Sequence, residues 1–218
     1  MKKIILLILL LSPLVLLAQG IDAPWWGVRG GVNFSKLSSE YYSTEYLTGF
    51  SIGGVYCYPI SKSIPIYIES GIYFQQRGAR DNGFLTESGE TSRLLTHEIE
   101  VPLLLGCHVS LARPWAIQAA VGFYYSVALN GSFKIGNNKF DPYDKELLQT
   151  LRDAAPKEQQ LLHRSDFGLR VGVSASYYRY LFGLTFDGGL LNLYAPDLRK
   201  VGYQALASCF TLQIGYNF

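Results

Sequence analysis

Six charged side chains have the greatest potential for chemistry, because each stands inside a segment of apolar or small residues. They are Arg29, Glu69, Glu98, Glu100, Arg170 and Asp187. If folding brings such groups together away from water, they must pair, because an unpaired buried charge is costly. We expect a structural network of ion pairs. The excess of four acids over two bases leaves a second hypothesis, a narrow cation path or proton-linked gate.

Three histidines, His97, His108 and His163, are the other candidates for chemistry. No serine or carboxylate stands at a spacing from them that specifies a catalytic triad. No set of histidines and cysteines has zinc-ligand spacing, and residues 81–83 (Asp-Asn-Gly) lack the pattern of a calcium loop. We therefore expect no catalytic residue, no cofactor and no metal.

The cysteines are odd in number and widely separated. Cys57, Cys107 and Cys209 form no CxxC motif, whereas small disulfide-stapled folds use denser and even sets. We expect three isolated thiols that fill space. A bridge between Cys57 and Cys209 remains open as an alternative.

Eight segments of alternating apolar and small or polar residues must position the charged groups. Period-two alternation is typical of β-strands with one apolar face, and the 16 Tyr, 12 Phe and 22 Gly suit such strands. All six charged residues fall on the polar face. The segments are 25–36, 48–60, 65–78, 96–111, 115–130, 166–178, 182–194 and 205–218.

The connections indicate which face meets lipid. They are long at 37–47, 79–95 and 131–165, short at 61–64, 112–114 and 179–181, and intermediate at 195–203. Outer-membrane barrels alternate short periplasmic turns with longer external loops, and the apolar face is long enough for a tilted strand to cross a bilayer. We predict an all-β fold, an eight-stranded antiparallel up-and-down transmembrane β-barrel with the six charges in its lumen.

The two ends of the chain carry sorting signals. Lys2 and Lys3 precede an apolar run to Leu17, which predicts a signal peptide over 1–18 and a barrel domain over 19–218. Its removal takes two of the 19 basic residues and none of the 17 acidic ones, so the formal net charge falls from +2 to zero. Such a balance gives no reason to expect nucleic acid as a partner.

The last strand alternates up to an aromatic residue. Ile214, Tyr216 and Phe218 share its apolar face, which resembles the C-terminal signal that barrel-assembly machinery recognises. We expect this strand to pair with the first one, because an open strand edge cannot be satisfied in lipid.

Several stretches resemble the porin-like or PorT-like outer-membrane β-barrel proteins of Bacteroidota. The most diagnostic are 75–78 (Gln-Gln-Arg-Gly) and 98–105 (EIEVPLLL); the others are 27–35, 48–61, 69–80, 97–106, 167–177 and 212–218. The resemblance implies an eight-stranded barrel and leaves its activity open.

The segment 131–165 is the most individual one. Asp141 and Pro142 are typical of a helix start, and Leu147, Leu148 and Leu151 form a short apolar stripe. We expect a small lid over the barrel mouth, with a docking surface for a partner as the alternative.

The sequence thus predicts an integral protein of a Gram-negative outer membrane. Its expected role is structural or interactive, through the external loops, and non-enzymatic. The alternatives are a narrow pore or a PorT-like secretion accessory, and then a lipid-modifying enzyme. Expected partners are outer-membrane lipids, the barrel-assembly machinery and an extracellular or envelope protein.

Overall fold

The computed structural model describes residues 23–38, 44–81, 91–112, 114–144, 162–194 and 204–218. The predicted signal peptide lies outside these residues. No helix among them is long and apolar enough to cross a membrane.

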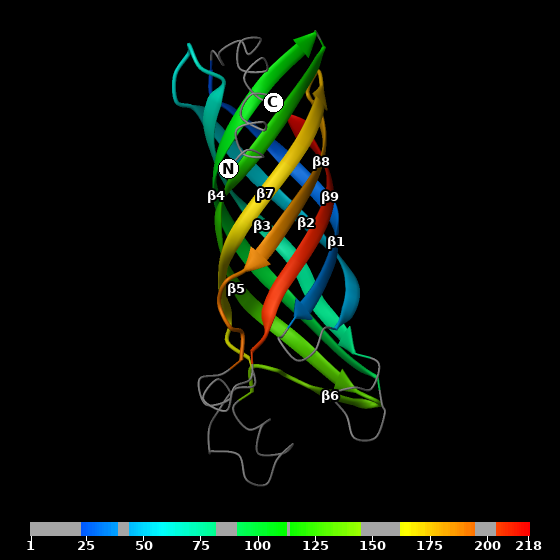
Figure 1. Ribbon diagram of the computed structural model, residues 1–218. Helices are drawn as coiled ribbons and strands as arrows, with labels where there is room; N and C mark the ends of the chain where they lie inside the picture. Colours follow the sequence, from blue (N-terminus) through cyan, green and yellow to red (C-terminus); the bar gives the residue numbers. More distant parts are fainter. Residues whose placement is uncertain (1–22, 39–43, 82–90, 113, 145–161, 195–203) are drawn as a thin grey trace, which may run out of the picture.

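One antiparallel sheet contains every strand of the described residues, and its strands follow the alternating segments of the sequence. The strands are β1 (Trp25–Ser38), β2 (Glu45–Pro59), β3 (Ile66–Asp81), β4 (Ser92–Ala112), β5 (Trp115–Ile135), β6 (Asn138–Phe140), β7 (Ser165–Tyr177), β8 (Tyr180–Gly189) and β9 (Leu206–Asn217). Figure 1 shows the eight long strands tilted around a common axis.

The sheet closes on itself as an eight-stranded barrel. Each of the eight long strands pairs with the next long strand along the chain, including β4 with β5 and β5 with β7. The first and last strands, β1 and β9, pair from Gly27↔Asn217 to Ser38↔Leu206. The last pairing removes the two open edges that lipid could not satisfy. The short β6 lies outside this ring and pairs only with the end of β5. The predicted fold is confirmed.

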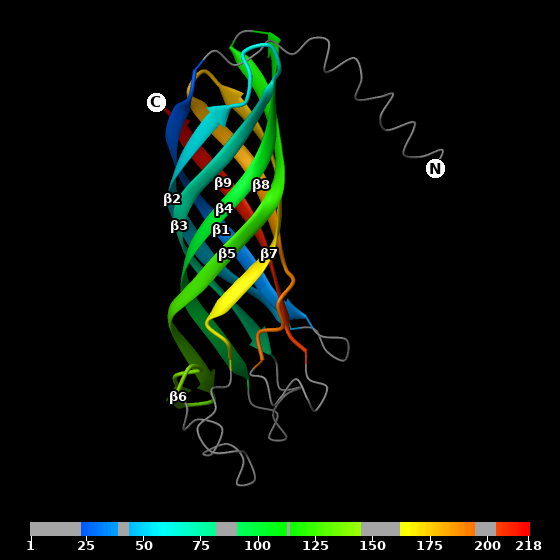
Figure 2. The same ribbon diagram turned by 90° about the vertical axis from the view of Figure 1, so that its left-hand side faces the viewer.

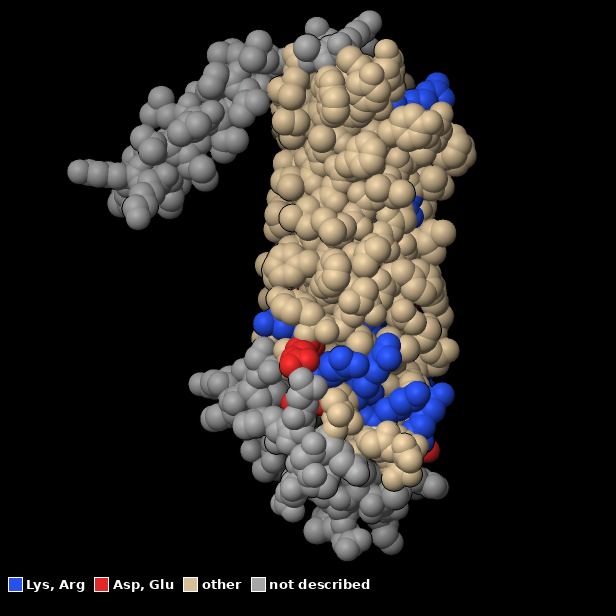
Figure 3. Space-filling view, turned by 90° about the vertical axis from the view of Figure 1, so that its right-hand side faces the viewer, with Lys and Arg blue, Asp and Glu red and all other residues tan. Residues whose placement is uncertain are grey.

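The two faces of the strands differ as the alternation predicts. Apolar side chains such as Ile72 and Ile214, each 63% exposed, stand on the outer surface, whereas Glu100 and Asp187 are buried in the interior. Figure 3 shows one side of the outer wall, where Lys and Arg gather near the end with the longer connections. We call this the loop end, and the opposite end, with turns after β2, β4 and β7, the short-turn end.

Two strands extend further than the sequence predicts. β4 and β5 have 21 residues each, and β5 continues through residues assigned above to the loop 131–165. The extension ends in a turn at Gly136, whose φ of 54° is the left-handed conformation that glycine adopts without strain. β6 then returns along β5, so this hairpin projects beyond the other strands at the loop end (Figure 2).

The predicted helix of this loop falls on residues 145–161, outside the described residues. Its expected start at Asp141 forms a turn, in which the amide of Tyr143 donates a hydrogen bond to the Asp141 carboxylate at 2.9 Å. β8 ends at Gly189, earlier than the predicted segment 182–194.

Candidate functional site

A ring of four charged side chains bridges the middle of the barrel. Arg77 on β3 and Glu100 on β4 come from one wall, and Arg170 on β7 and Asp187 on β8 come from the other. Arg77 pairs with Glu100 at 2.5 Å and with Asp187, while Arg170 lies 2.5 Å from both Glu100 and Asp187. Each base therefore touches both acids, and the ring has no net formal charge.

The ring excludes solvent. The side chains of Arg77 and Arg170 are 5% exposed, that of Asp187 is 1% exposed, and that of Glu100 is fully buried. Buried charges of this kind need close pairing, because their desolvation is costly.

Neighbouring side chains fix the two guanidinium groups. Arg77 donates a hydrogen bond from Nε to the Gln75 side chain at 3.0 Å and lies over the ring of Tyr124 at 5.1 Å. Arg170 lies 5.4 Å from the centre of the Tyr73 ring. Both tyrosines are themselves buried. The ring of charges is therefore packed against aromatic side chains on both walls.

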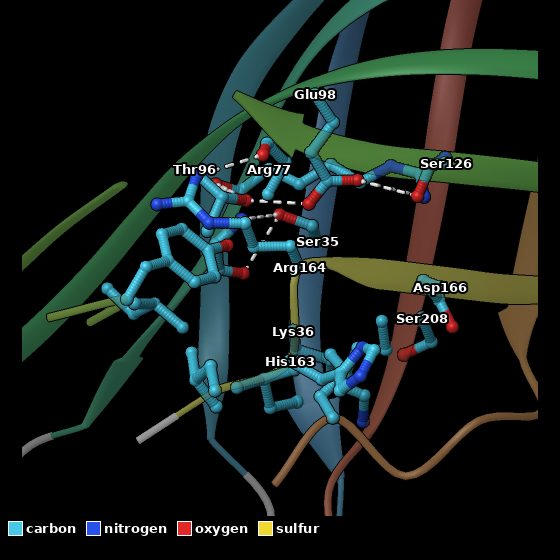
Figure 4. Close-up of a pocket in the computed structure, with 18 residues that line it drawn as sticks. Ser35, Lys36, Arg77, Thr96, Glu98, Ser126, His163, Arg164, Asp166 and Ser208 are labelled. Carbon is cyan, nitrogen blue, oxygen red and sulfur yellow. Dashed lines mark hydrogen bonds and ion pairs between the residues drawn. The ribbon is translucent and has the colours of Figure 1, made fainter. Parts of the chain in front are cut away.

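A small pocket lies on the loop side of the ring, with a volume of about 30 Å³. Glu98 points into it and accepts hydrogen bonds from Thr96 at 2.8 Å and from Ser126 at 3.1 Å (Figure 4). Asp166 accepts a bond from the Tyr124 hydroxyl at 2.7 Å through one oxygen, and its other oxygen has no partner among the described residues. The volume is large enough for water molecules and too small for a larger ligand.

An apolar cluster covers this pocket at the loop end. Leu94, Ala128, Tyr143 and Leu162 are buried together, and Phe133 and Tyr194 pack against them. Arg164 lies over the Tyr143 ring at 4.5 Å. Burial raises the pKa of Tyr143, so its hydroxyl stays neutral. The start of the segment 131–165 thus contributes to a cover over the barrel mouth.

A second polar group lies toward the short-turn end, where Arg29 and Glu69 line another pocket of about 30 Å³. Arg29 donates a hydrogen bond to the Asn217 side chain at 2.7 Å, and the Cys57 thiol lies 3.4 Å from a carboxylate oxygen of Glu69. Trp25 packs edge-on against Tyr67 at 5.1 Å between ring centres. Neither Arg29 nor Glu69 forms an ion pair with the ring of four charges.

A match to a sequence family identifies the family of this chain. The family model described as "Outer membrane protein beta-barrel domain" matches residues 18–194. The chain belongs to this family. It is an integral outer-membrane β-barrel protein, with strands that cross the outer membrane and a filled interior.

The chain is similar to several solved structures of outer-membrane proteins at low sequence identity. Ail of Yersinia pestis is 11% identical, with 91% of this chain and all of that chain covered and a TM-score of 0.44. Neisserial surface protein A is 11% identical, with 90% and 100% covered and a TM-score of 0.49. OprG of Pseudomonas aeruginosa is 12% identical, with 92% and 99% covered and a TM-score of 0.45. No curated protein sequence matches the chain.

The barrel brings together some of the predicted lumen residues and not others. Glu100, Arg170 and Asp187 meet in the ring, and Glu98 lies beside it, 3.9 Å from Arg77. Arg29 and Glu69 lie apart from it at the short-turn end. The six predicted residues therefore do not form a single network.

The predicted lumen network left out two buried charged residues of the predicted strands, Arg77 and Asp166. Both stand on the polar faces of their predicted strands, so the alternation already indicates that their side chains face the interior. Arg77 contacts both acids of the ring, and its inclusion balances the charges.

The three histidines lie in separate parts of the barrel. His97 lies on the outer surface, 5.9 Å from the Phe74 ring, and His108 lies inside, 3.1 Å from the Gln118 side chain. His163 accepts a hydrogen bond from the amide of Ser165. Among the described residues, no three His, Cys, Asp or Glu side chains are placed to hold a metal ion. The three cysteines are free thiols.

The predicted C-terminal assembly residues stand at the closing strand. Ile214 and Phe218 are exposed on the outer surface at 63% and 49%. The Phe218 ring stacks on Trp26 of β1 at 3.9 Å, and the Tyr216 ring lies 5.1 Å from it. The three side chains therefore form an accessible apolar stripe along β9.

Proposed function

We propose that this protein is a closed, non-enzymatic barrel that anchors an interaction surface at the loop end. The ring of Arg77, Glu100, Arg170 and Asp187 carries the proposal. It joins opposite walls of the barrel, is almost fully buried, and offers no excess charge to a passing ion.

Opening a path through the ring would separate buried ion pairs. Removing one partner from such a pair costs about 3–5 kcal/mol, because the other charge stays buried. The apolar cluster at the loop end and the Trp25–Tyr67 contact at the short-turn end add two further obstructions. A static barrel with this interior serves as an anchor.

The loop end supports the interactive part of the proposal. β4, β5 and β6 project beyond the remaining strands there, and the longer connections leave from the same end (Figure 2). Crosslinking in intact outer membranes, followed by identification of the neighbours, tests it. Neighbours that disappear when residues 136–140 are replaced by a short turn support the proposal, and neighbours unchanged by the replacement contradict it.

Conductance in planar bilayers tests the closed lumen. We expect no channel steps from the purified barrel. Steps in the unmodified protein that vanish in both Glu98→Gln and Glu100→Gln, and persist in Glu69→Gln, would show the narrow cation path instead.

A PorT-like secretion accessory remains the second candidate. The resemblance of residues 75–78 and 98–105 to PorT-like proteins favours it. Comparison of the secreted proteins of a strain with and without the gene tests this role, and unchanged secretion excludes it.

A further inference from the structure

Four cations lie side by side across four strands at the loop end. Arg80 on β3 is directly opposite Arg93 on β4, Arg93 is opposite Lys134 on β5, and Lys134 is opposite Lys139 on β6. All four side chains are exposed. Since adjacent strands are about 4.8 Å apart, this cationic row spans about 14 Å.

The cationic row faces away from the lumen. Ala79 and Leu94, the chain neighbours of Arg80 and Arg93, are buried in the interior at 4% and 8% exposure. Successive residues of a strand point to opposite faces. Residues directly opposite one another share a face, so the four cations form one outward surface.

The row lies beyond the lipid-facing apolar surface, on the side of the loop end. The outward face of β4 includes the apolar side chains of Leu105, Leu103 and Val101. The last apolar side chain on this face toward the loop end is Leu95. Arg93 follows two residues later, about 7 Å along the strand. On β3 and β5, the polar residues Gln76 and Asn130 separate the apolar surface from Arg80 and Lys134, so the row stands on the headgroup side of the lipid-facing surface.

The described residues place little negative charge beside the row. Like charges directly opposite in a sheet are destabilising. Within the described part of the chain, none of the four cations takes part in an ion pair. One carboxylate, that of Glu45 on β2, stands opposite Arg80 at the end of the row. Figure 3 shows Lys and Arg gathered at this end of the molecule.

We infer that the cationic row binds the phosphate groups of a phosphorylated glycolipid in the outer leaflet. Phosphate oxygens accept charge-assisted hydrogen bonds from Arg and Lys, and guanidinium groups bind them with two parallel bonds. Cations spaced about 4.8 Å apart allow one phosphate to contact two of them. The lipid also has acyl chains to cover the apolar wall below. This inference is independent of the closed lumen, since an open barrel would present the same row.

The test uses the full barrel in phosphatidylcholine nanodiscs that contain lipid A with two phosphates, or the same lipid after phosphatase treatment. Co-purified glycolipid is quantified by mass spectrometry, and unfolding is followed by the gel shift on heating. Arg93→Gln with Lys134→Gln removes the centre of the row. Lys62→Gln with Arg179→Gln removes two exposed cations from the short-turn end as the matched control.

We expect the phosphorylated lipid to be retained preferentially and to raise the unfolding temperature. Each cation near an anionic surface contributes about 1 kcal/mol, so the row variant should bind about thirtyfold more weakly, and the control should bind as the unmodified protein does. High salt should weaken retention. Equal retention of both lipids by the unmodified protein overturns the inference without any variant. Equal losses in both variants, or tighter binding of soluble heparin than of the glycolipid, also overturn it.

Discussion

Arg170 and Asp187 are directly opposite neighbours in β7 and β8, and their side chains meet at 2.5 Å in the centre of the barrel. The pair is also fixed by Glu100 and Arg77 from the opposite wall. Cross-strand pairing therefore supplies one side of the ring, and contacts across the lumen supply the other. The ring ties the two halves of the barrel together.

Loss of Asp187 should destabilise the barrel strongly. Asp187→Asn leaves Arg77 and Arg170 with one carboxylate between them, and we expect the free energy of unfolding to fall by about 3–5 kcal/mol. Urea titration in lipid vesicles, followed by tryptophan fluorescence, measures it. Glu69→Gln is the control, because Glu69 lies outside the ring, and a loss of equal size there would contradict the special position of Asp187.

The pair of Arg170 and Asp187 should be energetically coupled. In a double-mutant cycle with Arg170→Gln and Asp187→Asn, we expect a coupling free energy of about 1–3 kcal/mol, since both changes act on one network. Lys62→Gln with Asp187→Asn should be additive within about 0.5 kcal/mol. Additivity in the first cycle would mean that the two residues act separately.

Gly106 should tolerate no side chain while Tyr67 stands opposite it. A Cβ at Gly106 would lie 2.2 Å from the Tyr67 ring, whereas the nearest atom to a Cβ at Gly30 is 3.9 Å away. We expect Gly106→Ala to cost about 1–3 kcal/mol, as overpacking does, and Gly30→Ala to cost less. Unfolding in vesicles compares the two. Recovery of stability in Gly106→Ala with Tyr67→Leu would identify the ring as the cause.

Phe218 should matter for assembly more than other lipid-facing aromatics do. Phe218→Ala removes the stack on Trp26 and the last aromatic of the proposed assembly signal. We expect less heat-modifiable barrel in outer-membrane fractions. Phe182→Ala, at a similarly exposed position within β8, is the control. If both variants assemble to the same level, the signal does not depend on Phe218.

The alternation of the sequence predicted which residues face the lumen, because period two fixes the face of every strand residue. It did not predict which of them meet. Arg77 is the example: Glu100 lies opposite Tyr73, four residues from Arg77, and the long guanidinium side chain covers this distance along the strand. Such a contact depends on the stagger between neighbouring strands, which a single sequence does not encode visibly.

The β5 extension was missed for a similar reason. Residues 131–135 alternate in the opposite sense to the lipid-facing part of the strand, because Phe133 packs against the interior cluster and Lys134 faces outward after the register shift beside Leu129. Their pairing with β4 and β6 supports them instead.

The pairing of β1 with β9 joins positions as far apart as Gly27 and Asn217. We expect a pairing between such distant residues to form late in folding, because the entropy of loop closure is lost before the free energy of the pairing is gained. Until the barrel closes, the backbone amides along its two edge strands are unpaired, and hydrocarbon offers them no hydrogen-bond partner. We therefore expect the strands to insert and the barrel to close in one step, with both edge strands shielded from lipid until they meet.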